Sequence, residues 1–362
     1  MTDMVDQLAD LVGIESPSAD KEATARCASA VLDIGKELLG EPGETVVVDG
    51  TTHVRWRFGA GDKVLLLGHY DTVWPMGTLA RWPFAVDGDR ATGPGAFDMK
   101  GGIVQLFHAL AGLDSLDGVT VLLTGDEEVG SPSSKDLIVA EAGGKRAALV
   151  LEPGVGEDLK IARKGVSLYD LAITGRAAHA GLEPEKGANA TIELAHQILR
   201  IAQLGRPEVG TTVTPTVADA GTTTNTVPAA ATLHIDVRAF SVDEQERVDG
   251  DIRAAASAVS VDGVTVTVNG GPNRPPLPRT SSAALLERAN RVAAGLALPA
   301  LAGVEVGGGS DGNFTAGAGV PTLDGLGAIG ANAHAEGEYV VVSRMSERAA
   351  LVRGLVADLL SE

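Results

Sequence analysis

Three segments of this 362-residue chain begin as short apolar runs and end in polar motifs, and this pattern constrains its fold most. They read KVLLLGHYD, VTVLLTGDEEVGS and RAALVLEPG. The continuous apolar run Val64–Leu67 in the first segment is typical of a strand buried on both faces of a helix-covered sheet. Open α/β sheets place ligand sites just beyond the carboxyl ends of their strands. The pattern therefore predicts an α/β fold in which several strand ends deliver polar side chains to one rim.

Side chains of the types that bind divalent metals lie in these motifs and in two others. They are His69 in GHYDTV, Asp98 in GPGAFDMKGG, Glu128 in GDEEVGS, Glu152 in VLEPG and His334 in AHAEGE. Zn²⁺, Co²⁺ and Mn²⁺ all accept imidazole and carboxylate ligands. Two ions that share one carboxylate need about five protein ligands and keep open positions for water and substrate. The set therefore predicts a site for two divalent ions, which can be Zn²⁺, Co²⁺ or Mn²⁺.

Two further acids lie next to these candidate ligands. Glu127 precedes Glu128, and Asp71 follows His69 by two residues. Hydrolysis at a metal site needs a nearby group that takes and returns a proton, and ligating imidazoles are commonly oriented by a carboxylate. With Glu127 as the proton-transfer group and Asp71 as the orienting acid, the motifs together indicate a hydrolase.

Each motif has an alternative interpretation when it is taken alone. A histidine at a strand end is more often hydrogen-bonded than bound to a metal. Asp98 can cap the helix expected over MKGGIVQLFHALAGL, and Asp126–Glu128 can form a solvated acidic turn. A non-catalytic binding protein on the same fold is a distant alternative, and loss of Glu127 or of the ligands would be its simplest sign. The presence of all these residues in one chain favours the enzyme.

The middle of the chain has a different organisation. From Val166 onward the segments VSLYDLAITG, ANATIELAHQILRIAQL, TVTPTVADAG and AATLHIDVRAF, a helix from Asp243 to Val259, and VTVTVNG follow in the order βαββαβ. This order is the ferredoxin-like pattern. The tract GGPNRPPLPRT is expected to be the exit hinge, since proline cannot join a strand ladder or continue a helix. We therefore predict a discontinuous catalytic domain with a helix-covered mixed sheet, at residues 1–165 and 276–362, and an inserted α+β domain at residues 166–275.

Composition restricts the partners of the protein. The net charge is −19, so nucleic acid and anionic membranes would be repelled. Cys27 is the only cysteine, which excludes an internal disulfide. The start, MTDMVDQLADLVGIES, lacks the basic residues and apolar run of a signal peptide, and no apolar stretch approaches the length of a membrane span. We expect a soluble, cytoplasmic protein that acts on small molecules.

The motifs GHYDTV, GPGAFDMKGG, DEEVGS, EPG, GRAAHAG, TTTNTVPA, DVR, GGGSDG and AHAEGEYV occur in order over nearly the whole chain. Together they resemble the glutamate carboxypeptidase, aminoacylase and acetylornithine deacetylase family of two-zinc amidohydrolases, with the glutamate carboxypeptidase branch most similar. The resemblance implies that Asp98 bridges two zinc ions. One ion would also bind His69 and Glu152, and the other would bind Glu128 and His334.

The same resemblance implies roles for residues that bind no metal. Glu127 would be the base and acid, and Asp71 would orient His69. His179 and Asn225 would polarise the scissile carbonyl, with His179 reaching across from the partner subunit of a homodimer formed by the inserted domain. Arg238 would bind the substrate carboxylate.

The expected reaction is cleavage of the amide bond to a C-terminal, glutamate-like amino acid in an N-acyl amino acid or short peptide. Lys160 lies near the position of a side-chain selector in some family members. An N-acyl-amino-acid deacylase or a dipeptidase is the alternative, because it would share every metal residue. AAHAG in place of SHAG, and GGSDG in place of GGTD, are the departures from the family pattern. Ala178 removes a hydroxyl beside His179, which affects substrate binding and not the metal site.

Overall fold

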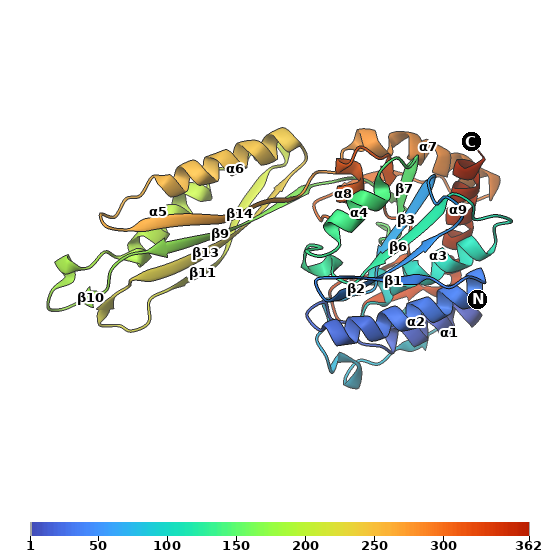
Figure 1. Ribbon diagram of the computed structural model, residues 1–362, viewed down its shortest axis with the longest axis horizontal. Helices are drawn as coiled ribbons and strands as arrows, with labels where there is room; N and C mark the ends of the chain where they lie inside the picture. Colours follow the sequence, from blue (N-terminus) through green and yellow to red (C-terminus); the bar gives the residue numbers. More distant parts are fainter. Residues whose placement is uncertain (1, 362) are drawn as a thin grey trace. The chain divides into compact units, whose positions relative to one another are not determined.

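The computed structural model describes residues 2–361, which form two compact units (Figure 1). The first unit contains the residues up to Arg163, Leu277–Val306 and the residues from Ser310 onward. The second contains Lys164–Pro276 and the short segment Gly307–Gly309. The fold is thus a discontinuous α/β domain with an α+β insert. No helix among residues 2–361 combines the length and the apolar character needed to cross a bilayer.

A six-stranded mixed sheet forms the centre of the first unit. Its strand order is β1 (Glu44–Val48), β2 (Thr51–Arg57), β6 (Val119–Thr124), β3 (Val64–His69), β7 (Ala147–Val150) and β16 (Thr322–Leu323). The first two strands join the sheet antiparallel, whereas β6, β3, β7 and β16 are parallel to one another. The predicted mixed sheet is confirmed, and three of its parallel strands are the three apolar segments of the sequence.

Both faces of this sheet are covered by helices. Val64 and Leu66 of β3 belong to the larger hydrophobic core, whereas Leu65 and Leu67 belong to a separate core on the other face. The larger core includes side chains of α1 (Thr2–Val12), α2 (Lys21–Leu39), α3 (Gly101–Ala111), α7 (Arg279–Gly295) and α9 (Val342–Leu360). The smaller core includes α4 (Lys135–Ala142) and α8 (Gly312–Gly317). Burial on both faces explains why the strands read as continuous apolar runs.

Shorter elements complete the first unit. A small sheet has the strand order β17 (Gly330–Ala331), β18 (Tyr339–Val341), β5 (Arg90–Thr92) and β4 (Ala85–Asp87). Parallel to each other lie β8 (Leu159–Arg163) and β15 (Gly303–Val306). The small sheet brings the residues that follow His334 beside the segment that leads to Asp98.

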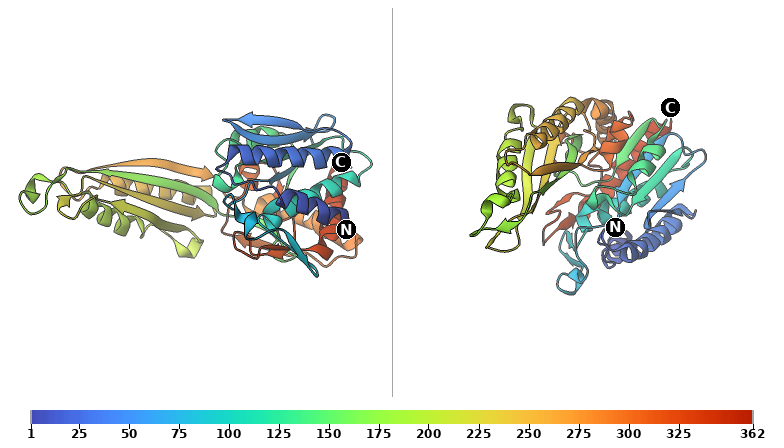
Figure 2. Two further views of the ribbon diagram at one scale, coloured as in Figure 1. Left: turned by 90° about the horizontal axis from the view of Figure 1, so that it is seen from below. Right: turned by 60° about the vertical axis from the view of Figure 1, so that its left-hand side comes forward.

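The second unit is an antiparallel sheet packed against two helices (Figure 2). Its elements follow the predicted order: β9 (Gly165–Thr174), α5 (Ala190–Ile201), β11 (Thr212–Ala220), β13 (Ala230–Ala239), α6 (Val242–Ser257) and β14 (Thr265–Arg274). The spatial order is β11-β13-β9-β14. The ferredoxin-like arrangement is therefore confirmed. A two-stranded sheet of β10 (Ala178–His179) and β12 (Thr226–Val227) was not predicted.

The expectation that the prolines of GGPNRPPLPRT stay out of the sheet is wrong for Pro272. This residue lies in β14 opposite Ser167, just before a register shift. β14 is an edge strand and its register shifts just after Pro272, and edge strands and bulges are the places where a sheet tolerates proline.

Candidate active site

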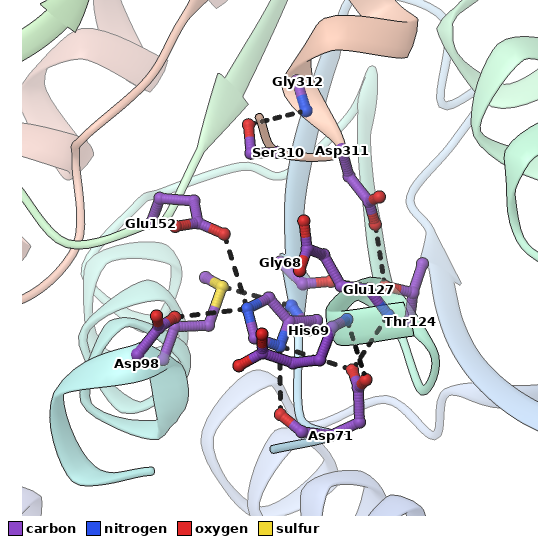
Figure 3. Close-up of polar contacts among 12 residues, drawn as sticks. Gly68, His69, Asp71, Asp98, Thr124, Glu127, Glu152, Ser310, Asp311 and Gly312 are labelled. Carbon is purple, nitrogen blue, oxygen red and sulfur yellow. Dashed lines mark hydrogen bonds and ion pairs between the residues drawn. The ribbon is translucent and has the colours of Figure 1, made fainter. Parts of the chain in front are cut away.

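Three parallel strands bring four of the predicted site residues to one edge of the sheet. His69 is the last residue of β3, and Glu152 follows β7 by two residues. Glu127 and Glu128 begin a 3-10 turn just after β6. Because β6, β3 and β7 are parallel neighbours, their carboxyl ends lie side by side. The predicted rim of polar side chains is present (Figure 3).

Asp98 reaches the same edge from a π-helical turn, Ala96–Lys100, which leads directly into α3. Close approach of α3 to the β7 end requires Gly102, where a Cβ atom would lie 2.3 Å from the carbonyl oxygen of Leu151. The N-terminus of α3 has no side-chain hydrogen-bond cap. The capping alternative for Asp98 is therefore not what the structure shows.

The carboxylate of Asp98 lies between two imidazoles. Its Oδ1 is 3.3 Å from His69 Nε2, and its Oδ2 is 3.3 Å from His334 Nε2. His69 Nε2 is also 3.4 Å from Glu152 Oε1, and His334 Nε2 is 3.1 Å from Glu128 Oε1. The five candidate ligands thus form two sets, His69–Glu152 and His334–Glu128, with Asp98 common to both.

These separations fit divalent metal ions. Ligand atoms at about 2.0–2.1 Å from a tetrahedral ion lie roughly 3.3 Å from one another. An imidazole Nε2 has at most one proton to donate, yet each Nε2 here faces two carboxylates. Asp98 Oδ1 is buried and accepts no hydrogen bond from the described residues. Ligand atoms of His69, Asp98 and Glu128, and likewise those of His69, Glu127 and Glu152, lie within 4.8 Å of one another.

The electrostatics of the cluster favour a bound cation. Burial opposes ionisation of Asp98, but the contacts of its carboxylate with the His334 and His69 imidazoles outweigh burial and lower the pKa of the carboxyl. Hydrogen bonds to Asp98 and Glu128 raise the pKa of His334 to about 10. Burial disfavours the charged form of His69, but Asp71, Asp98 and Glu152 raise its pKa well above the ordinary value. Negative charge is therefore in excess at this point of the molecule, and divalent cations would neutralise it.

Asp71 organises the side of His69 that faces away from this cluster. His69 Nδ1 is 3.1 Å from the carbonyl oxygen of Asp71 and 3.3 Å from its Oδ1. The buried carboxylate also accepts hydrogen bonds from the N–H groups of Glu127 (3.2 Å) and Glu128 (3.1 Å), and from the Ser18 hydroxyl (2.7 Å). Asp71 therefore fixes both the imidazole and the acidic turn.

The acidic turn is not a solvated one. Asp126 accepts hydrogen bonds from Ser133 N and Oγ and from Ser134 Oγ, at 2.5–2.7 Å. Asp126 and Glu127 are both buried. Adjacent carboxylates thus serve different purposes, because Asp126 ties the turn to the following segment while Glu127 and Glu128 face the cluster.

Two largely buried cationic side chains contact Glu152. The Oε2 atom of Glu152 is 3.4 Å from Arg163 Nη2 and 3.8 Å from Lys160 Nζ. Arg163 makes a two-pronged contact with Asp324, at 2.6 and 3.2 Å, and Ser310 donates to Asp324 at 2.6 Å. Burial, then the charge of Arg163, lowers the pKa of Lys160. The structure thus places Lys160 beside a candidate metal ligand. Sequence analysis missed Arg163 and Asp324, since neither lies in a ligand motif.

Glu338 was also missed as a separate residue, although it lies within the quoted motif AHAEGEYV. It is buried and accepts a hydrogen bond from the backbone N–H of Asp98 at 2.8 Å. The signal was its position four residues after His334.

The remaining predicted residues belong to the second unit. His179 and Asn225 come together there, since the N–H of Ala180 donates to the Asn225 carbonyl oxygen at 2.9 Å. His179 Nδ1 accepts from the N–H of Gly181 at 3.1 Å, which leaves Nε2 as the protonated nitrogen of a neutral ring. Arg238 lies on β13 in the other sheet of this unit, where Asp236 binds its Nε and Nη2 at 2.7–3.1 Å.

Comparison with known proteins identifies the family of the chain. The model of Peptidase family M20/M25/M40 matches residues 65–358 of this chain. Carboxypeptidase G2 from Pseudomonas sp. (strain RS-16) is 31% identical over 371 residues, which cover 98% of this chain and 89% of that protein. Acetylornithine deacetylase from Myxococcus xanthus is 31% identical over 208 residues, or 52% of this chain and 53% of that protein. The M20 family metallo-carboxypeptidase Sso-CP2 from Sulfolobus solfataricus superposes with a TM-score of 0.76 at 19% identity, covering 98% of this chain and 99% of that one.

The fold and the relatives define a metal-dependent hydrolase of peptide or amide bonds. The chain belongs to peptidase family M20/M25/M40. The family membership, the fold class and the enzyme class predicted from the sequence are confirmed.

Proposed function

We propose that this protein binds two divalent ions, zinc in preference to cobalt or manganese, and releases a C-terminal amino acid from N-acyl amino acids or short peptides. The observation that carries the proposal is the position of Asp98, whose two oxygens each lie 3.3 Å from a different imidazole. One ion would be held by His69, Glu152 and Asp98, and the other by His334, Glu128 and Asp98.

Hydrolysis of the amide adds water to the carbonyl carbon and breaks the C–N bond. When bound, the ions supply Lewis acidity, which acidifies the attacking water and polarises the carbonyl. Glu127 takes a proton from that water and delivers it to the departing amine. A carboxylate oxygen of Glu127 lies within 4.8 Å of a ring nitrogen of His69 and of a carboxylate oxygen of Glu152, which supports this role. Asp71 keeps the His69 ring in its orientation throughout.

Residues of the second unit would bind the substrate. His179, with Nε2 as its protonated nitrogen, and Asn225 would donate hydrogen bonds to the scissile carbonyl oxygen. Arg238 has five N–H donors, and the edge that Asp236 leaves would bind the free carboxylate of the departing amino acid. Lys160, in the first unit, would select an acidic side chain. We further propose a homodimer formed through the second unit, in which His179 serves the partner's site.

A deacylase is the second candidate. The likeness to acetylornithine deacetylase over about half of the chain supports it. Such an enzyme would use the same metal residues and differ only in which part of the substrate is selected. The greater coverage of the carboxypeptidase relative favours release of a C-terminal amino acid.

A hydrolysis screen tests both candidates. Dipeptides, N-acyl-glutamates and N-acetyl derivatives of other amino acids are offered to protein loaded with Zn²⁺, Co²⁺ or Mn²⁺, and Glu127→Gln serves as the inactive control. Cleavage of varied acyl groups from one amino acid supports the carboxypeptidase. Cleavage restricted to one acyl group on varied amino acids supports the deacylase. No hydrolysis above the Glu127→Gln control would contradict the proposal.

A further inference from the structure

Glu338 is a buried carboxylate with four N–H donors around it. Its Oε1 accepts from the backbone N–H groups of Phe97 (2.7 Å) and Asp98 (2.8 Å). Its Oε2 accepts from the N–H of Gly95 (3.1 Å) and from the indole of Trp74 (3.1 Å). The side chain is fully buried, at 0% exposure. A buried charge is tolerated only where hydrogen bonds compensate its lost hydration, and here each oxygen has two donors.

The donors belong to the segment that presents Asp98 to the metal cluster. Gly95, Phe97 and Asp98 are consecutive or nearly so, and they span the entry to the π-helical turn. Within this turn Asp98 departs from helical geometry, with φ −114° and ψ 96°. The helix ladder therefore does not dictate the orientation of its peptide, and the carboxylate of Glu338 supplies the constraint through the Asp98 N–H group.

Glu338 also fixes its own segment. Its N–H donates to the carbonyl oxygen of Ala335 at 3.1 Å, and its carbonyl oxygen accepts from Gly93 N at 3.4 Å. His334 lies immediately before Ala335. The two segments joined by Glu338 thus carry His334 and Asp98, which the proposed function assigns to the same ion.

We propose that Glu338 is a positioning residue that holds the Asp98 and His334 segments in the arrangement that binds metal. The inference rests on the proposed two-ion site. Aspartate has a short side chain, so a small rotation of the Asp98 peptide would move both of its oxygens away from His69 and His334. Glu338 acts through the backbone and contacts neither ion nor substrate.

Glu338→Gln separates this role from simple space filling. The amide has the same shape, but its NH2 group would face two N–H donors on one side, so two hydrogen bonds would be replaced by repulsion. Glu336→Gln is the matched control, because it removes the same charge from the same segment. The Glu336 side chain is 61% exposed and pairs with Arg81 at the surface.

Metal affinity is the main readout, measured by competition with a chromogenic chelator. Loss of a group that orients metal ligands typically costs about 10–100-fold in affinity, and we expect a loss of this size for Glu338→Gln and less than about 2-fold for Glu336→Gln. With saturating metal, kcat should fall while KM changes little. Unchanged affinity in Glu338→Gln would overturn the inference and leave the proposed function intact. A wild-type protein that binds no divalent ion would overturn both.

A second measurement does not depend on the variant folding. In metal-free wild type, hydrogen exchange of the peptide that covers residues 93–100 should be slow, and addition of Zn²⁺ should change it little, because Glu338 already holds these N–H groups. Rapid exchange that becomes slow only on addition of metal would show that the ions, not Glu338, arrange the segment.

Discussion

Asp71 faces Nδ1 of His69 at 3.3 Å, so the opposite ring nitrogen of His69 is the one directed at the candidate metal ligands. The same carboxylate holds the peptide N–H groups of Glu127 and Glu128. One buried acid therefore sets the geometry at the ends of two neighbouring strands.

Asp71→Asn should weaken metal binding without unfolding the protein. Asparagine keeps one acceptor oxygen, but its NH2 group would face a backbone donor, and an orienting contact of this kind is worth about 10–100-fold in metal affinity or activity. Chelator competition measures the loss. Ser18→Ala is the control, since it removes one donor to Asp71 and leaves the carboxylate in place. Equal behaviour of the two variants would argue against an orienting role.

The shared position of Asp98 predicts a distinctive metal stoichiometry. Protein purified without chelator should contain close to two divalent ions per chain by elemental analysis. His334→Ala and Glu152→Ala should each lose one ion, whereas Asp98→Ala should weaken both because both sets include it. A single tightly bound ion that survives in the Asp98 variant would refute the bridge.

Glu127 and Glu128 should behave differently although they are adjacent. Glu127→Gln should keep both ions and lose turnover by about 10²–10⁴-fold, the size typical of a proton-transfer group. Glu128→Gln should lose an ion, because Glu128 lies 3.1 Å from His334. Elemental analysis together with kcat distinguishes the two. The reverse outcome would mean that the pair has been assigned the wrong way round.

Arg238→Ala should selectively damage hydrolysis of substrates with a free carboxylate. A charge-assisted, bidentate contact is among the strong hydrogen bonds, so kcat/KM for such substrates should fall by about 10–100-fold. Rates on carboxyl-amidated analogues should already be low in the wild type. Efficient wild-type cleavage of amidated peptides would contradict the role of Arg238.

Lys160→Ala should reduce the preference of the enzyme for substrates with acidic side chains over substrates with aliphatic ones.

Mixed dimers test whether His179 serves the partner's site. His179→Ala and Glu127→Gln should each be nearly inactive alone. After subunit exchange, some dimers combine an intact Glu127 from one chain with an intact His179 from the other, and activity should return. Full activity in a protein that is monomeric by light scattering would rule out the shared site.

Sequence patterns predicted what is local and periodic. The apolar runs that lead to His69, Glu128 and Glu152 predicted three strands and the polar rim at their ends. This was possible because a strand buried on both faces has apolar residues at every position. The helix over residues 2–12 also has apolar residues at helical spacing.

Polar contacts between residues far apart in the sequence could not be predicted from such patterns. Glu338 accepts hydrogen bonds from backbone N–H groups about 240 residues away in the sequence. Almost every residue type has such an N–H group, so the residue type gives no sign of the contact. Arg163 and Asp324 meet across 161 residues, and only the tertiary fold shows that their charges are paired. Glu338, Arg163 and Asp324 support the candidate ligands from distant parts of the chain, whereas Asp71 could be predicted because it lies in the same motif as His69.

All five candidate metal ligands lie in the first unit, whereas His179, Asn225 and Arg238 lie in the insert. Under the proposed roles, substitutions at these three positions of the insert would alter which amides are accepted and leave the candidate metal ligands unchanged. Such a division would let related enzymes differ in substrate while they retain the same metal site. Kinship to both a carboxypeptidase and a deacetylase is the outcome this separation would produce.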